Sequence, residues 1–228
     1  MNMNKIFTFL DRLDQHNNKK WMDEYRVYYE ESRHIFKELI QTMLDNVGLF
    51  DSQVADQRVQ DSLFYINRNQ RFNKNLPPYK NYFSALISKE GRHSVYSGYY
   101  IHLQPGNKSF VGAGIYHPNS EILKTIRLGI SNEGSRLKEI MDQPHFSRVF
   151  GSMEGSCLKR APKEFNEDHP FIELIKHKDF IVSREFKDHE VLGKNFISNL
   201  IQYCYYLKNF NHFFNNIILE QVSDKELV

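Results

Sequence analysis

The residues best suited to chemistry in this sequence form a basic loop within residues 62–89. This stretch contains no aspartate or glutamate, whereas the rest of the chain has slightly more acidic than basic residues. Arg68 and Arg71 stand three residues apart, so their guanidinium groups can converge on one phosphate or carboxylate. Pro77 and Pro78 stiffen the returning side of the loop. The sequence therefore predicts an anion site built from Arg68, Arg71, Lys74, Tyr79 and Lys80.

The same arginines have an alternative, structural interpretation. Arg68 and Arg71 would then be buried partners of carboxylates on a helix, such as Asp23 or Glu24. This alternative predicts that Arg71→Ala unfolds the protein. The anion-site hypothesis predicts instead that a ligand is lost while stability is unchanged.

A second chemical feature is a predicted β-hairpin that turns at Pro105-Gly106-Asn107. Because alternate residues of a strand share a side, Tyr100 and His102 point away from the apolar residues between and beside them. On the partner strand, Gly112 and Gly114 share one side, and a register that pairs residue 100 with 112 places them beside Tyr100 and His102. This pattern predicts a hollow floored by glycine. The alternative is that the glycines let an aromatic ring from another element pack closely.

The histidines and cysteines show none of the spacings that indicate a metal site. The chain has 10 histidines and 2 cysteines, Cys157 and Cys204, and no pair of them stands at zinc-ligand spacing. We therefore expect no metal site, and the sequence identifies no cofactor, no catalytic residue and no phosphate-binding glycine loop. If the protein is an enzyme, His102 is the candidate general base, because histidine titrates near neutral pH.

The elements that must position these residues are strands in the middle of the chain and helices at both ends. The predicted strands are rich in aromatic and β-branched residues and are bounded by turn residues. They cover residues 62–68, 82–88, 97–104, 109–116 and 180–186.

Helices are predicted where apolar residues recur at three- and four-residue steps. One long helix follows Asn17 or Asn18, either of which is a suitable N-cap, and fills the rest of the first fifty residues. Another follows Asn119, with a second short piece behind it. The clearest covers residues 196–217, where one continuous apolar seam runs along the helix. Such a seam is typical of a helix that covers a sheet, and a coiled-coil homodimer is the alternative.

These elements predict one α+β domain over residues 1–228, with a central antiparallel sheet of about four to five strands packed by long N-terminal and C-terminal helices. With 40% hydrophobic and 25% charged residues, the chain can build a core, which excludes wholesale disorder. Few cysteines, no signal peptide and no long apolar run lead us to expect a cytoplasmic protein without a membrane span. A net charge of +2 argues against general coating of nucleic acid.

On these residues the chain resembles a family of conserved hypothetical bacterial and fungal proteins, domain of unknown function 2461. The resemblance runs over nearly the whole chain and implies no established function. The family's central pattern is represented here by Arg68, Arg71, Phe72, Lys74, Pro78, Tyr79 and Lys80. The other matching residues are Phe9-Leu10, Asn17-Asn18, Trp21, Gly98-Tyr99-Tyr100, His102, Gly112-Ala113-Gly114, Pro118, Arg127, Leu158-Lys159-Arg160-Ala161-Pro162, His169-Pro170 and Lys178.

The chain departs from the family pattern at positions close to the basic loop. Asn69 stands where the family has an acidic residue after the first arginine, and Asn75 and Leu76 stand where it has an Asp-Lys pair. Tyr65 occupies a position where an arginine is expected. Without those carboxylates the loop is more cationic, which argues against a carboxylate base or metal ligand there.

The sequence thus predicts a protein that binds a small anionic ligand, bearing a phosphate or a carboxylate, through the basic loop beside the hairpin. The alternative is a nucleic-acid or protein interaction module without catalytic activity. In that case the loop contacts phosphates and exposed aromatic residues stack on bases, with steep salt dependence.

Overall fold

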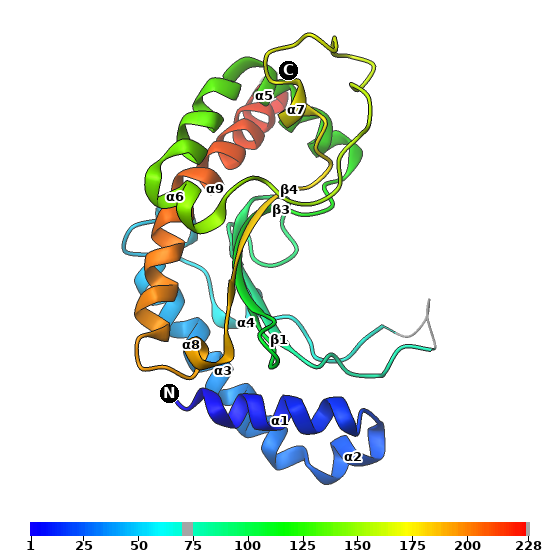
Figure 1. Cartoon of the computed structure of the whole chain (residues 1–228), viewed down its shortest axis with the longest axis vertical. Coiled ribbons are helices and arrows are strands. Elements are labelled where there is room, and N and C mark those ends of the chain that lie inside the picture. Colours follow the sequence, from blue (N-terminus) through cyan, green and yellow to red (C-terminus); the bar gives the residue numbers. More distant parts are fainter. Residues whose placement is uncertain (70–74, 227–228) are drawn as a thin grey trace. The chain divides into compact units, whose positions relative to one another are not determined.

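The computed structural model describes residues 1–69 and 75–226 (Figure 1). These residues include a four-stranded antiparallel sheet in the order β1-β2-β3-β4, helices before and after it in the chain, and three helices between β3 and β4. The predicted α+β class is confirmed. The strands are β1 (Phe83–Ser88), β2 (Gly98–Leu103), β3 (Ser109–Ile115) and β4 (Phe180–Phe186). The helices are α1 (Met3–Gln15), α2 (Lys19–Glu24), α3 (Arg26–Val47), η1 (Ser52–Val54), α4 (Val59–Ser62), α5 (Ser120–Asp142), α6 (Pro144–Phe150), α7 (Ile172–Ile175), α8 (Asp188–Val191) and α9 (Phe196–Glu226).

The chain divides into two compact units, each assembled from three separate segments. The first unit contains Met1–Arg92, Tyr100–Val111 and Glu185–Tyr203, and the second contains the segments that follow each of these. The single domain over residues 1–228 stays a prediction.

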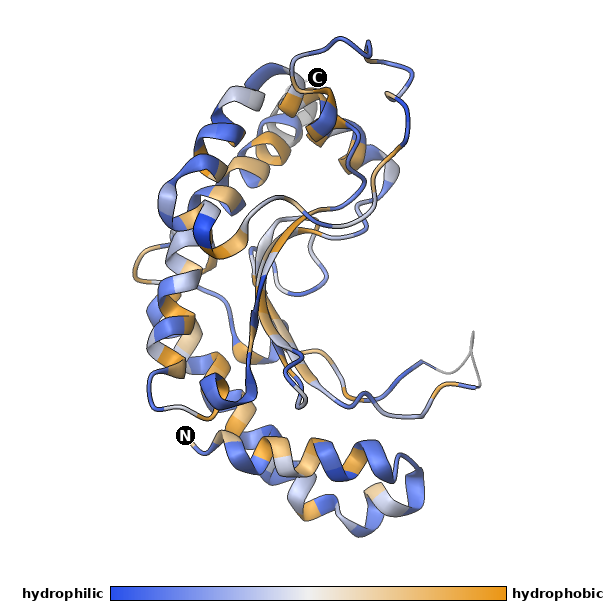
Figure 2. Ribbon diagram, viewed as in Figure 1, coloured by the Kyte–Doolittle hydropathy of each residue, from blue (hydrophilic) through white to orange (hydrophobic). Residues whose placement is uncertain are grey.

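The core of the first unit forms where α1 and α3 meet one side of β1. Phe83 of β1 stacks on Phe36 of α3 with 5.4 Å between the ring centroids, and the ring of Phe9 in α1 lies 6.2 Å from Phe83. All three side chains are buried. Apolar positions recur along α1 and α3 between polar ones (Figure 2). Because apolar residues at helical spacing share one face, both helices can bury that face against the strand.

The long helix predicted after Asn17 or Asn18 is two helices, so that prediction was wrong in its continuity. Asn18 is the N-cap of α2, since its side-chain oxygen accepts a hydrogen bond from the Trp21 amide at 3.0 Å. The helix then breaks at Tyr25, whose backbone angles are φ −99° and ψ 23°, and α3 starts at Arg26. A break of one residue preserves the three- and four-residue spacing of apolar side chains, which is why the pattern did not reveal it.

The segment predicted as a strand over residues 62–68 does not form a regular strand. Ser62 ends α4, and the residues that follow form only isolated bridges, Leu63 with Ala85 and Asn67 with Tyr79. The second bridge joins residues 64–69 to the returning residues 75–82 at Asn67 and Tyr79. We call these two segments the arm; they leave the sheet side by side in Figure 1.

The second unit has an aromatic core around its part of α9. Phe214 lies 5.0 Å from Phe210 and 5.5 Å from Phe180 of β4, and Phe146 of α6 lies 5.5 Å from Phe210. The apolar seam of α9 is buried here, as expected for a helix that covers a sheet, so it is not an exposed coiled-coil surface. Helix α5 begins with Asn119 as its cap, and it continues through a kink at Glu133 where the sequence indicated two separate pieces.

A buried polar cluster fixes α9 to the segment before β2 within the second unit. The Asn215 side chain accepts from the Ser97 amide at 2.7 Å and donates to the Ser97 carbonyl at 3.2 Å. The Ser97 hydroxyl donates to Asn211 Oδ1 at 2.5 Å, and all three residues are at most 2% exposed. Because a buried polar group without a partner is destabilising, these bonds select one register of the helix.

Candidate functional site

The predicted site residues Arg68, Tyr79 and Lys80 lie on the arm in the first unit. The Arg68 amide donates to the Pro78 carbonyl at 2.9 Å, and the Lys80 amide donates to the Ile66 carbonyl at 2.8 Å. Arg68 Nε also donates to the Tyr79 carbonyl at 3.1 Å. These bonds fix the register of the two segments, and they place the Arg68 and Lys80 side chains close enough for their charges to interact.

Asn17 holds the returning segment of the arm against the turn between α1 and α2. Its side-chain amide donates to the Tyr79 carbonyl at 3.0 Å, and its side-chain oxygen accepts from the Tyr79 amide at 3.1 Å. One asparagine thus replaces the pair of backbone hydrogen bonds that a neighbouring strand would make. Tyr79 itself is buried, so it contributes to the packing that anchors the arm.

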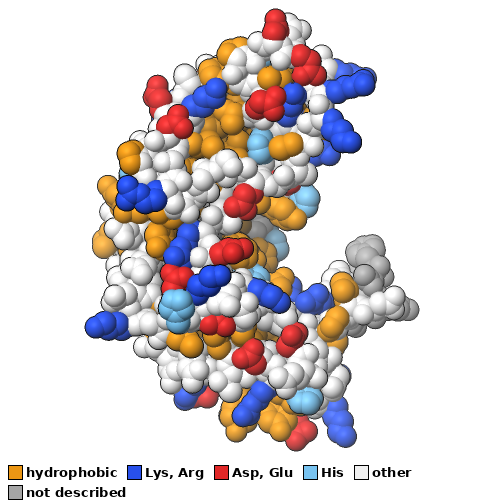
Figure 3. Space-filling view, viewed as in Figure 1, with side chains coloured by type: hydrophobic (Ala, Val, Ile, Leu, Met, Phe, Trp, Pro, Cys, Tyr) orange, Lys and Arg blue, Asp and Glu red, His pale blue; other side chains and the backbone are white. Residues whose placement is uncertain are grey.

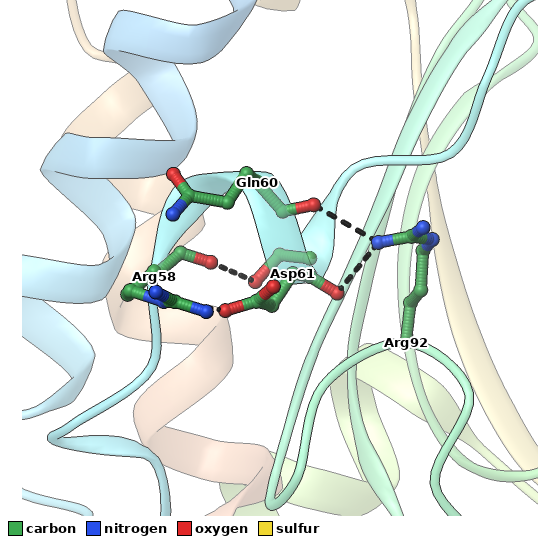
Figure 4. A network of polar contacts seen from close by, with 5 residues as sticks. Arg58, Gln60, Asp61 and Arg92 are labelled. Carbon is green, nitrogen blue, oxygen red and sulfur yellow. Dashed lines mark hydrogen bonds and ion pairs between the residues drawn. The ribbon is translucent and has the colours of Figure 1, made fainter.

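The base of the arm is fixed by a network of polar contacts around α4 (Figure 4). Arg92 donates to the carbonyls of Gln60 at 2.9 Å and Asp61 at 3.2 Å, while Arg58 pairs with the Asp61 carboxylate at 2.7 Å. The Arg92 guanidinium also lies 5.6 Å from the ring centroid of Tyr65. Tyr65 therefore offers a cation–π partner at the position where the family pattern predicted an arginine.

Lys80 is the central cation of this region. Its ammonium lies 5.7 Å from the centroid of Phe64 and 5.8 Å from that of Tyr82. Among residues 1–69 and 75–226, no carboxylate lies within 4.0 Å of it. Its partial burial, together with the nearby charge of Arg68, lowers the pKa of Lys80. A lysine that has lost hydration beside a second cation is stabilised in its charged form by a bound anion.

The sheet beside the arm presents a set of aromatic side chains that we call the aromatic face. His102 stacks on Phe110 with 4.7 Å between ring centroids, and Tyr82 lies 4.3 Å from His102 on β1's side. Ile101 and Leu103 are almost fully buried, as predicted for the apolar side of β2, but His102 is buried as well, so burial does not alternate along the strand. The aromatic face consists of Phe64, Tyr82, Tyr100, His102 and Phe110, of which only His102 is buried.

A chain of side-chain hydrogen bonds runs from the aromatic face to a carboxylate on α1. His102 Nε2 lies 2.9 Å from Gln104 Oε1, Gln104 donates to Asn81 at 3.3 Å, and Asn81 donates to Asp14 at 2.8 Å. Because the amide oxygen of Gln104 can only accept, Nε2 of His102 carries the hydrogen. Nδ1 is then the acceptor for the Tyr100 hydroxyl, which lies 3.4 Å away. Every donor in this chain points toward Asp14.

The protonation states of this chain follow from its burial. Desolvation lowers the pKa of His102; the hydrogen bond to Gln104 opposes that shift, and the charge of Lys80 adds to it. Desolvation also raises the pKa of Tyr100, against the effect of a hydrogen bond with Ser84. Near neutral pH, His102 is therefore neutral with both ring nitrogens engaged, and Tyr100 keeps its proton. This arrangement suits a positioned hydrogen-bond donor better than a free general base.

The predicted glycines Gly112 and Gly114 belong to the second unit, where β3 meets β4. A Cβ atom on Gly112 would lie 2.8 Å from the Val182 carbonyl oxygen, and one on Gly114 would lie 1.9 Å from that of Phe180. Gly114 also has φ +117°, which other residues rarely adopt. The space beside these glycines is therefore filled by the backbone of β4, rather than by the hollow or the aromatic ring that the sequence suggested.

Two predicted residues of the basic loop, Arg71 and Lys74, lie outside the described residues. The structural alternative for Arg68 is not supported, because Arg68 donates to a backbone carbonyl while Asp23 pairs with Lys19 at 2.6 Å. The sequence predicts Asn17 or Asn18 as a helix cap, whereas in the structure Asn18 is the cap and Asn17 holds Tyr79 of the arm. Of the residues around the site, the sequence-based prediction missed Asp14, Phe64, Asn81, Tyr82, Gln104 and Phe110. Only Gln104 could have been found, because it lies two residues from His102 and therefore on the same side of the strand.

Comparison with known proteins identifies the family of the chain. A family model described as Conserved hypothetical protein (DUF2461) matches residues 5–213, which is nearly the full chain. The chain belongs to this family. No curated protein matches the chain, and no solved structure matches it. The DUF2461 match includes the arm, the aromatic face and Asn17, so the resemblance stated from the sequence is confirmed.

The DUF2461-like residues of the second unit have structural roles. Arg127 donates to the carbonyls of Ile175 at 2.9 Å and His177 at 3.2 Å. His169 accepts from the Phe171 amide through Nδ1 at 3.2 Å, so Nε2 must donate to the Ser131 hydroxyl at 3.0 Å. A histidine that donates to a serine cannot take its proton, which excludes activation of Ser131 by this histidine.

Asp179 is a buried structural carboxylate of the same unit. It accepts from the His117 amide at 3.0 Å and from the amide and hydroxyl of Ser156 at 3.0 and 2.6 Å. Burial acts to raise the pKa of Asp179, but these hydrogen bonds hold it below its ordinary value. Among the described residues, no group of three or more His, Cys, Asp or Glu could hold a metal ion. No helix in the described part of the chain is long and apolar enough to cross a membrane.

Proposed function

We propose that this protein binds a small anionic ligand, bearing a phosphate or a carboxylate, between the arm and the aromatic face of the first unit. The observation that carries the proposal is the environment of Lys80. This half-buried ammonium lies over two aromatic rings, near the charge of Arg68, and within the described residues it has no carboxylate partner. Structural lysines that are partly buried are normally paired, so an uncompensated pair of cations favours an external anion.

The side chains around Lys80 favour a ligand that combines an anionic group with a flat ring. Phe64 and Tyr82 beside Lys80, and Phe110 farther along the aromatic face, are only partly buried, and each offers a ring on which a base or another planar group can stack. Tyr100 keeps its hydroxyl hydrogen, because burial raises its pKa. A nucleotide fits this combination, and a phosphorylated sugar would use the charged contacts alone.

The distribution of charge supports a discrete site over a nucleic-acid-binding surface. On the visible face of the described residues, basic and acidic side chains are intermixed (Figure 3). A duplex or single-strand binder needs a continuous basic surface that follows the phosphate backbone. We propose a cytoplasmic location as well, and the two unpaired cysteines, Cys157 and Cys204, support it.

The test is thermal unfolding of the wild type and two lysine variants with a small set of compounds. Adenosine 5′-monophosphate, ribose 5-phosphate, citrate and a short oligonucleotide are compared with uncharged adenosine. Lys80→Gln removes the central cation, and Lys108→Gln removes an exposed cation of the hairpin turn in the same unit. A ligand at about 100 times its Kd should stabilise the wild type by about 2.7 kcal/mol.

The proposal predicts that an anionic compound raises Tm in the wild type and in Lys108→Gln but not in Lys80→Gln. Adenosine should give a smaller shift, because it lacks the charged group. An equal shift in Lys80→Gln would contradict the proposal, as would the absence of any shift with all compounds. A shift seen only with the oligonucleotide, and lost steeply as salt rises, would favour the interaction-module alternative.

A further inference from the structure

A pocket of about 370 Å³ lies among α1, α2 and α3 of the first unit, and it shares no lining residue with the arm or the aromatic face. Its volume falls in the range of small-molecule sites. The residues on which its chemistry depends are Lys5, Phe9, Arg12, Trp21, Tyr25 and Glu31.

The aromatic wall of this pocket comes from α2 and from Tyr25, the residue that follows it. Trp21 and Tyr25 are four residues apart, so their rings lie on one side of this helical turn and stack with 4.7 Å between centroids and 15° between planes. Phe9 of α1 lies 6.0 Å from Trp21 and is 3% exposed, whereas Tyr28 at the rim is 53% exposed. The pocket thus has a buried aromatic floor and an open aromatic rim.

The charges in the pocket leave one cation uncompensated. Lys5 forms an ion pair with Glu31, which neutralises both. Arg12 lines the same pocket, and among residues 1–69 and 75–226 no carboxylate lies within 4.0 Å of its guanidinium. The pocket therefore carries a net positive charge beside its rings. An aromatic cage can also hold a quaternary ammonium, but Arg12 would repel such a ligand and Glu31 is already paired.

We propose that this pocket is a second binding site, for a small molecule that combines one flat ring with a carboxylate or phosphate. The ring packs against Trp21, Tyr25 and Tyr28, where offset stacking and burial both contribute. The acid group pairs with Arg12, whose planar guanidinium can hold two anionic oxygens at once. The site is independent of the one at Lys80, because each has its own rings and its own cation.

Trp21 is the only tryptophan of the chain, so its fluorescence reports on this pocket. Emission is titrated with phenyl phosphate, with uncharged benzyl alcohol and with the cation benzyltrimethylammonium. The variants are Arg12→Gln, which removes the proposed charge contact, and Lys20→Gln, which removes an exposed cation of α2 outside the pocket lining. Lys80→Gln is included because it removes the cation of the other proposed site. Thermal unfolding without ligand checks that every variant is folded.

The proposal predicts a saturable change in emission with phenyl phosphate, and binding at least about tenfold weaker in Arg12→Gln. Lys20→Gln and Lys80→Gln should bind phenyl phosphate as the wild type does. Equal binding of benzyl alcohol or benzyltrimethylammonium would overturn the proposal, and so would unchanged binding in Arg12→Gln. Loss of the signal in Lys80→Gln would overturn it as well, since the anion would then occupy the site at Lys80. Absence of a saturable change with phenyl phosphate in the wild type would also refute it.

Discussion

Replacement of Asn17 by alanine should release the arm, because this one side chain satisfies both backbone groups of Tyr79. The two hydrogen bonds, at 3.0 and 3.1 Å, connect residues that are 62 positions apart in the chain. The Tyr79 carbonyl keeps its bond from Arg68 Nε, whereas the Tyr79 amide loses the partner that Asn17 provides.

The expected loss of stability follows from these contacts. Two hydrogen bonds contribute about 0.5–1.5 kcal/mol each, so Asn17→Ala should lower the free energy of unfolding by about 1–3 kcal/mol. The upper part of this range applies if the Tyr79 amide stays buried without a partner. The lower part applies if the arm opens and water replaces Asn17.

Urea unfolding gives the total effect, and amide hydrogen exchange shows where it arises. In Asn17→Ala the amides of Tyr79 and Lys80 should exchange much faster, while the amides of β2 stay protected. Asn18→Ala is the matched control, because it removes the cap of α2 and a local bond to the His16 carbonyl but no contact with the arm, with an expected loss of about 1 kcal/mol. It should leave exchange at Tyr79 unchanged.

The reasoning would be refuted if Asn17→Ala and Asn18→Ala had the same exchange pattern at Tyr79 and Lys80. It would equally be refuted if Asn17→Ala changed the free energy of unfolding by less than Asn18→Ala. Either result would mean that packing of Tyr79, rather than the asparagine, holds the arm.

Three further substitutions test other parts of the account. His102 has a lowered pKa, so the unfolded chain binds its proton more readily, and the stability that His102 contributes is present above the ordinary pKa of 6.5 and lost as the pH falls below it. His102→Gln should therefore lose less stability than the wild type on acidification below 6.5. Urea unfolding measured across this pH range tests this, and identical losses in the two proteins would contradict it. Gly114→Ala should destabilise the protein far more than Gly106→Ala. A Cβ atom on Gly114 would lie 1.9 Å from a carbonyl oxygen, whereas one on Gly106 would have no neighbour within 4 Å. Equal urea midpoints for the two variants would contradict this and would show that β4 moves aside. Asn215→Leu should lower the free energy of unfolding by about 2–4 kcal/mol, because it removes the side chain that binds the buried amide and carbonyl of Ser97. If calorimetry shows no loss of stability, these hydrogen bonds do not fix the register of α9.

The parts of the fold that follow from local pattern could be predicted from the sequence. The alternation in β2 predicted that Ile101 and Leu103 belong to the core, and the apolar seam of α9 predicted a helix that packs in the core. A cap at Asn17 or Asn18 was recognisable, because an asparagine before an amphipathic pattern satisfies free amides at the helix start, and the structure gives this role to Asn18. In each case the deciding interaction lies within a few residues of the one that reveals it.

The features that the sequence could not give depend on pairs that are distant in the chain. Asn17 and Tyr79 are 62 residues apart, and nothing in the type of either residue indicates the other. The glycines of β3 indicated either a hollow or a closely packed aromatic ring, because a glycine signals close approach without showing what approaches. In the structure the neighbour is the backbone of β4, whose pairing with β3 spans the whole of α5 to α7.

The sequence showed that the arm is basic, but it could not show the surroundings of Lys80. Composition showed a basic segment and suggested that Arg68 and Lys80 act together. It could not show that Lys80 lies over Phe64 and Tyr82, or that the described residues leave it without a carboxylate. Burial and pairing are properties of the folded chain, and they decide whether a cation is a solvated side chain or part of a site.

The most direct test of the central claim is an NMR titration of Lys80 itself, on protein that carries carbon-labelled lysine. The Lys80 signal is assigned by its absence from the spectrum of Lys80→Gln. Without ligand, Lys80 should titrate below its ordinary pKa of 10.5, because it is desolvated and faces Arg68. Saturating adenosine 5′-monophosphate should raise that pKa, since a bound anion stabilises the charged form. A Lys80 that titrates at its ordinary pKa without ligand, or whose pKa does not respond to any of the anionic compounds, would contradict the proposed site.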